Sequence, residues 1–164
     1  AQGFGLITRT SVAGSDAEMR QWASDARATS QYGIDRFSAL QATGAPNTPQ
    51  CGDRATAWAS RSSRGQDQLT VFFDRAVSPT EINIHQTFTP GSITGISFIN
   101  AATGEEIEIE NSASTDRTCP NVFQLSLELS ELPPVNGVII TLDQTIGGNW
   151  NEIDAVELVG FPAE

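Results

Sequence analysis

Two carboxylates near the end of the chain carry the strongest chemical signal in the sequence. Glu152 and Asp154 stand in the run 150–158 and share strand parity with the apolar Val156 and Leu158. If this run is a strand that covers one side of a core, both carboxylates enter on the apolar side. A charge in such a place requires a compensating partner.

Three arrangements satisfy that requirement. A Ca²⁺ ion held by carboxylate and backbone carbonyl oxygens would neutralise the pair. A nearby arginine such as Arg36 or Arg54 would do the same, and the chain offers no lysine for the purpose. In the third arrangement the strand begins later, and both side chains lie in solvent just before its start.

Aromatic residues next to polar ones suggest a second kind of site. The apolar C–H face of a sugar can lie on an aromatic ring, while its hydroxyls require polar partners. Phe88 and Thr89 form one such combination, and Asn149, Trp150 and Asn151 form another. Both are expected in loops, where they would make a shallow saccharide site. We interpret Trp22 and Trp58 as packing residues instead.

Catalysis has no positive signal. His85 is the only histidine. Its strand parity places it opposite Ile82 and Ile84, on the polar face. The chain has no nucleophile elbow, zinc-binding HExxH or phosphate loop. We therefore expect no enzyme, although a pair of carboxylates in a deep cleft would reopen the question.

The charge balance excludes several partners. The chain of 164 residues has 20 acidic residues and nine arginines, for a net charge of −11, and the whole excess lies in residues 101–164. Binding to nucleic acid or to an anionic membrane surface requires a basic face. No apolar run approaches the ~20 residues of a spanning helix, so membrane insertion is excluded too. We interpret the acidic run 105–110 as a solvated strand face.

Cys51 and Cys119 both lie in turn-rich polar stretches. A bridge between them would close a long loop and stabilise the fold by roughly 4 kcal/mol. We predict this disulfide, with two free thiols as the alternative. A disulfide is typical of oxidising compartments, which favours an extracellular or cell-surface location.

Short apolar or alternating runs bounded by Gly and Pro predict an all-β antiparallel sandwich. The expected strands are 69–73, 81–88, 93–99, 106–110, 123–129, 138–142 and 153–159. Ser15 to Glu18 has the form of a capping box before Met19 and Trp22 and predicts the start of one short helix there. We interpret residues 1–19 as an N-terminal arm or edge segment and 20–164 as one domain.

The order of several motifs resembles that of galactose-binding-like, discoidin-type domains, which include the C-type domains of coagulation factors. The run 32–47 resembles their opening, and Thr56-Ala57-Trp58 resembles the T-x-W that follows it. Gln86–Ser92 and the closing run 152–160, with its sequence EIDAVEL, resemble a subgroup found in bacterial secreted proteins.

This resemblance implies a jelly roll that binds ligands through loops at one end and catalyses nothing. It also implies a structural Ca²⁺ held by Thr43 or Asn47 in the first loop and by Glu152, with Asp154 as a second choice. The chain departs from many relatives by having Thr43-Gly44 where they have Asp-Gly, which removes one carboxylate.

We therefore expect a secreted, non-catalytic module that binds carbohydrate through Phe88, Thr89, Asn149, Trp150 and Asn151. The alternative is an adhesion or surface-assembly domain whose partner is another protein.

Overall fold

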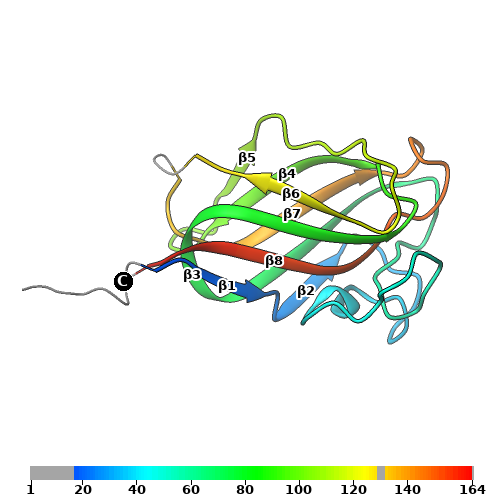
Figure 1. Ribbon diagram of the computed structural model, residues 1–164, viewed down its shortest axis with the longest axis horizontal. Helices are drawn as coiled ribbons and strands as arrows, with labels where there is room; N and C mark the ends of the chain where they lie inside the picture. The colour runs from blue at the N-terminus through cyan, green and yellow to red at the C-terminus, as the bar shows by residue number, and fades with distance from the viewer. Residues whose placement is uncertain (1–16, 129–131, 164) are drawn as a thin grey trace, which may run out of the picture.

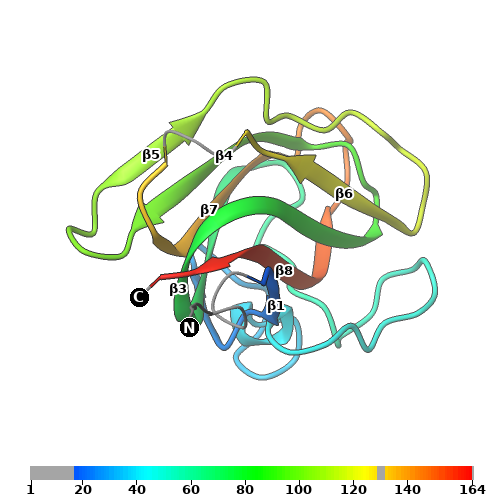
Figure 2. The ribbon, with the colours of Figure 1, turned by 60° about the vertical axis from the view of Figure 1, so that its left-hand side comes forward.

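The longest strand, β3, belongs to both layers of the fold. In the computed structural model, which describes residues 17–128 and 132–163, β3 spans Gln66–Phe88. Its first half pairs with β2 and β7, and its second half pairs with β6 and β8. The pairing register shifts between Phe72 and Val77, where the strand passes from one layer to the other. Figure 2 shows the resulting curve of β3 between the two layers.

The other strands are arranged around β3 in antiparallel pairs (Figure 1). The path of hydrogen-bonded strands is β1-β8-β3-β7-β4-β5, with β2 and β6 also paired to β3. Their bounds are β1 Met19–Trp22, β2 Asp25–Ala28, β4 Ile93–Asn100, β5 Glu106–Ile109, β6 Asn121–Ser126, β7 Val135–Asp143 and β8 Glu152–Pro162. The all-β antiparallel sandwich is thus confirmed.

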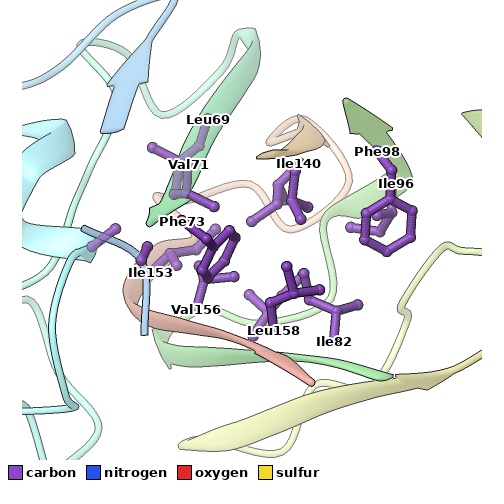
Figure 3. Close-up of a cluster of buried hydrophobic side chains, with 14 of the residues drawn as sticks. Leu69, Val71, Phe73, Ile82, Ile96, Phe98, Ile140, Ile153, Val156 and Leu158 are labelled. Carbon is purple, nitrogen blue, oxygen red and sulfur yellow. The ribbon is translucent and has the colours of Figure 1, made fainter. Parts of the chain in front are cut away.

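Apolar side chains from the two layers meet in one core. Figure 3 shows side chains of β3, β4 and β7 opposite those of β8. Leu69, Phe98, Ile140 and Leu158 are all fully buried. Ile82 is buried as well, and His85 lies on the opposite face, as their alternation predicts.

The sequence predicted two strands, 69–73 and 81–88, where the structure has one. Pro79 lies at a bulge, where the pairing with β8 shifts register before Glu81. A bulge tolerates a residue that cannot donate to the ladder. Gly160 of β8 lies opposite Pro79, and a Cβ there would stand 2.3 Å from the Ser78 carbonyl oxygen. The close approach therefore requires glycine at this position.

The short helix predicted to continue from the capping box into Met19 and Trp22 is wrong for the part that the structure describes. Met19 to Trp22 form β1, which pairs with Gly160 to Glu157 of β8. Edge pairing with a long core strand prevails over a local capping signal. The only helical turn in the described ranges is the 3₁₀ turn η3, Ala39–Ala42. No helix in those ranges has the length and hydropathy to cross a bilayer.

Some sequence predictions lie wholly or partly outside the described residues. The predicted arm includes residues 1–16, which are not described, so the domain boundary at 19 stays a prediction. Leu129, the predicted end of one strand, is also outside them. The acidic run is confirmed as a solvated face, since Glu106 and Glu108 are exposed on the edge strand β5.

Burial predicts a clear contrast between two substitutions on β8 and β6, the strands that flank the second half of β3. Leu158 is fully buried, whereas the side chain of Val122 is 47% exposed. We expect Leu158→Ala to lower the free energy of unfolding by about 2–5 kcal/mol and Val122→Ala by well under half of that. Urea unfolding followed by tryptophan fluorescence measures both. Equal losses would contradict this location of the core.

Candidate functional site

The acidic pair at the start of β8 is buried. Glu152 is the first residue of the strand and is 0% exposed, and Asp154 is 1% exposed. The arrangement in which both side chains lie in solvent just before the start of the strand is therefore wrong. Each carboxyl group needs its own set of donors, and backbone amides supply most of them.

Asp154 is fully engaged by one loop. Its Oδ2 accepts the backbone N–H groups of Asn47 and Thr48 at 3.0 and 2.9 Å, and its Oδ1 accepts the Thr48 hydroxyl at 2.8 Å. Three donors to one carboxylate fasten the loop to β8. Asp154 therefore has a structural partner without any arginine.

Glu152 is only half engaged. Its Oε1 accepts the backbone N–H of Arg54 at 3.0 Å, and its Oε2 has no hydrogen-bond partner. Burial is the largest cause that raises the pKa of Glu152 to about 9. A hydrogen bond from the protonated carboxyl group to the Asp53 side chain also raises it. Neither Arg36 nor Arg54 compensates the charge with its guanidinium group. The ion pairs among residues 17–128 and 132–163 all involve Arg20.

Glu152 lines a small cavity at the loop end of the sandwich. The cavity has a volume of about 150 Å³ and is lined by Tyr32, Phe37, Asp53, Ala59, Trp150 and Glu152. These residues come from three loops and from the start of β8, which meet at the right-hand end of Figure 1. A volume of this size accommodates one six-membered ring.

Three aromatic rings form the apolar walls of the cavity. The Tyr32 ring stands edge-on to Phe37, with ring centres 5.3 Å apart and planes at 76°. It stands in the same way to Trp150, at 5.7 Å and 83°. Nearly perpendicular rings leave both an aromatic face and an aromatic edge available to a ligand. The side chain of Tyr32 is 58% exposed, so the cavity communicates with solvent.

Backbone hydrogen bonds hold the aromatic residues in place. The Tyr32 N–H donates to the Ala59 carbonyl at 2.7 Å, and the Phe37 N–H donates to the Ala55 carbonyl at 3.0 Å. The Trp150 indole N–H donates to the Ser60 carbonyl at 2.9 Å. All three rings are therefore anchored to the segment that precedes β3.

A buried polar cluster behind the cavity joins the same loops. Gln144 is 0% exposed, and its amide nitrogen donates to the Ser60 hydroxyl and to Asp67 Oδ2. Its Oε1 accepts the N–H of Asn151 at 3.2 Å. Asp67 Oδ1 in turn accepts the hydroxyl groups of Thr29 and Ser30. Satisfied clusters of this kind fix the geometry of the groups that they connect.

The predicted disulfide is confirmed. Cys51 and Cys119 are bonded, with their Cα atoms 5.5 Å apart. The bridge lies two residues before Asp53 and ties its loop to the segment that leads into β6. The N–H of Gly52 also donates to the Thr87 carbonyl at 2.9 Å, which adds a second anchor beside the cavity.

Of the five predicted ligand-binding residues, the structure places Trp150 in the cavity and the other four elsewhere. Asn151 is fully buried, and its Oδ1 accepts the Ser92 N–H. Asn149 Oδ1 accepts the N–H of Trp150. Phe88 pairs with Glu152 through the backbone at the end of β3, and Thr89 packs beside the β7–β8 loop.

The other tryptophans differ from one another. Trp58 is fully buried, as predicted, and its indole N–H donates to the Ser30 carbonyl. Trp22 is only half-buried, and its ring stands edge-on to His85 with ring centres 5.5 Å apart.

Sequence reasoning missed Phe37 and Asp53 and gave Tyr32 no role in a site. One signal was available for the two rings. Tyr32 and Phe37 flank a short polar stretch that contains Gly33, which is typical of a turn between two packed aromatics. Nothing local indicates that Asp53, in the turn after Cys51, lies beside Glu152.

The four residues named for calcium divide between two places. Asp154 lines a different hollow from Glu152, and its oxygens already accept amide and hydroxyl groups. The Thr43 hydroxyl donates to the Leu40 carbonyl, and Asn47 donates its N–H to Asp154. Glu152 Oε2 is the one carboxylate oxygen of the set that has no donor. Calcium stays a prediction that depends on this atom.

The sequence matches one protein family. The sequence model described as "Pappalysin-1, SD scarf domain, C-terminal" matches residues 12–164. The chain belongs to this family. No curated protein matches its sequence.

Solved structures of carbohydrate-binding modules and lectins share the fold. One is the family 32 module of NanJ from C. perfringens in complex with galactose. It is 20% identical with a TM-score of 0.63, and the alignment covers 86% of this chain and 99% of that chain. A point mutant of chitosan-binding module 1 from Paenibacillus sp. IK-5 is 13% identical with a TM-score of 0.58, covering 82% and 92%. A fucolectin from striped bass serum is 13% identical with a TM-score of 0.62, covering 87% and 50%.

These similarities confirm the galactose-binding-like jelly roll that the resemblance implied. The SD scarf domain described here has the fold of a binding module, and its loop-end cavity is the candidate site.

The raised pKa of Glu152 predicts a pH dependence of stability. Its carboxyl group keeps its proton up to about pH 9 in the folded state but ionises near its ordinary value of 4.5 when unfolded. The folded state therefore binds more protons between these values, and stability falls as pH rises through the window. We expect the unfolding free energy of wild type minus that of Glu152→Gln to decrease from pH 5 to pH 9. Urea unfolding in EDTA measures it, and a flat difference would contradict the neutral carboxyl group.

Calcium binding at Glu152 predicts a different result. A ligand that binds only the folded state stabilises it by about 2.7 kcal/mol at one hundred times its dissociation constant. We expect the wild-type melting temperature to be higher in calcium than in EDTA, and the Glu152→Gln protein to melt equally in both. Equal melting temperatures for wild type would remove calcium from this site.

Proposed function

We propose that this domain is a secreted, non-catalytic module that binds carbohydrate in the cavity formed by Tyr32, Phe37, Asp53, Trp150 and Glu152. The supporting observation is a ring-sized cavity with aromatic walls on one side and carboxyl groups on the other. The apolar face of a sugar ring lies against the aromatic rings, and its hydroxyl groups donate to the carboxyl oxygens.

Solved structures of similar domains bound to sugars support this class of ligand. The NanJ module is in complex with galactose, and the lectin domain of lectinolysin is in complex with the Lewis B antigen. The disulfide supports an extracellular location, since such bonds persist in oxidising compartments. His85 stands half-buried against Trp22, outside the cavity, so the site contains no histidine base.

One observation favours a second function, binding to another protein. Ile34 is 87% exposed and Leu40 is 57% exposed, and both lie in the segment that carries Tyr32 and Phe37. Exposed apolar side chains beside a binding cavity are typical of protein interfaces. Leu40 lines neither the cavity nor the hollow beside it, so Leu40→Ser would weaken the recovery of a protein partner by pull-down and leave sugar binding unchanged.

The proposed sugar site predicts the effect of two truncations. We expect Tyr32→Ala and Trp150→Ala each to weaken saccharide binding about tenfold or more, because each removes a wall on which the ring lies. Ile146→Ala is the matched control, since Ile146 is 47% exposed in the β7–β8 loop and does not line the cavity. A glycan array followed by calorimetry on its best ligand measures all three. Folded protein that binds no glycan would remove the proposal.

A further inference from the structure

The polar wall of the cavity is formed by the carboxyl groups of Glu152 and Asp53. Glu152 is fully buried, its Oε1 accepts the Arg54 N–H, and its Oε2 has no partner. A buried acceptor that lacks a donor is unfavourable by about 1–3 kcal/mol. A ligand that brings an N–H or O–H group to this oxygen completes the site.

The negative charge of this wall comes from Asp53, which is exposed and lines the cavity together with the neutral carboxyl group of Glu152. Within residues 17–128 and 132–163, neither carboxyl group forms an ion pair. The chain contains no lysine at all. The site therefore offers a cationic ligand a place that no side chain of the described residues occupies.

The aromatic walls favour the same ligand charge. A cation over the face of tyrosine or tryptophan is attracted by the ring quadrupole. Tyr32 and Trp150 are in edge-to-face contact, with ring centres 5.7 Å apart, and both rings line the cavity. Carboxyl groups and aromatic faces thus act on one small volume from different sides.

We infer that the cavity selects a sugar ring that bears an ammonium group, as in the deacetylated units of chitosan. The inference rests on the proposed carbohydrate function and names the class of sugar. The ammonium group donates one N–H bond to the Asp53 carboxylate. A cation beside Glu152 favours the ionised carboxyl group, so the Glu152 proton passes to solvent and Oε2 accepts a second N–H bond. N-acetylation of the same sugar removes the charge and leaves a single, bulkier N–H donor.

A neighbouring hollow favours a chain of sugars over an isolated ammonium ion. This hollow shares Tyr32 and Phe37 with the cavity and is lined further by the turn 33–36. A ligand that extends past the two shared rings reaches it directly. Asp35 and Arg36 both line it and carry opposite charges, so selection for a cation arises in the first cavity.

The test compares two oligosaccharides that differ only in acetylation. Calorimetry in EDTA, at a pH where the amines are protonated, measures fully deacetylated chitosan oligomers against N-acetylated oligomers of the same length. We expect the deacetylated ligand to bind at least about tenfold more tightly, because charge-assisted hydrogen bonds are about twice as strong as neutral ones. The advantage should shrink as salt screens the exposed Asp53.

Two matched variants assign the preference to the cavity. Asp53→Asn removes an exposed carboxyl group that lines it, and we expect the preference for the deacetylated oligomer to fall about tenfold. Asp35→Asn removes the same charge from the neighbouring hollow, and we expect the preference to remain. Glu152→Gln, checked for folding by its melting curve, should act like Asp53→Asn.

The outcomes separate this inference from the proposed function. Equal binding of the two oligomers, or tighter binding of the acetylated one, would overturn the amino-sugar inference and leave carbohydrate binding standing. If no oligosaccharide from the glycan array binds, both fail. A lysine-rich peptide that binds more tightly than chitosan would also overturn the inference, because the ammonium group would then belong to a protein.

Discussion

Burial of two carboxyl groups at the start of β8 is the constraint around which the loop end of this domain is organised. Glu152 and Asp154 lie where side chains enter the core, and each must find hydrogen-bond donors inside the protein. The donors are backbone amides of Asn47, Thr48 and Arg54, which lie about one hundred positions earlier in the chain. The requirement for donors thus determines where the long loop before β3 must lie.

The same constraint leaves Glu152 with a free oxygen beside three aromatic rings. Asp154 uses its oxygens to hold the loop, whereas Glu152 uses only one. The two acidic residues of one motif therefore have different tasks. The buried cluster around Gln144 and the disulfide at Cys51 fix the surrounding loops, so that the cavity is present before any ligand arrives.

Alternation of residue types predicted the parts of the fold that depend on local sequence. Ile82 and His85 lie on opposite faces of β3, and Glu152 and Asp154 of the EIDAVEL run point inward. The continuity of β3 through Pro79 was not predictable, because the bulge that accommodates proline is made by pairing with β8. The residues that line the cavity could not be predicted from local sequence either. Asp53 and Trp150 are nearly a hundred residues apart, and only the packed loops bring them together.

The passage of β3 through both layers has a consequence for how the domain opens. A sandwich whose layers are joined only by loops can loosen one layer while the other persists. Here one strand of 23 residues belongs to both ladders: β7 pairs with its first half and β8 with its second half. Amide hydrogens on the two layers should therefore exchange with a common free energy of opening, as in a single cooperative unit. Among the described strands, the edge strands β1 and β5 do not pair with β3 and are free to open separately.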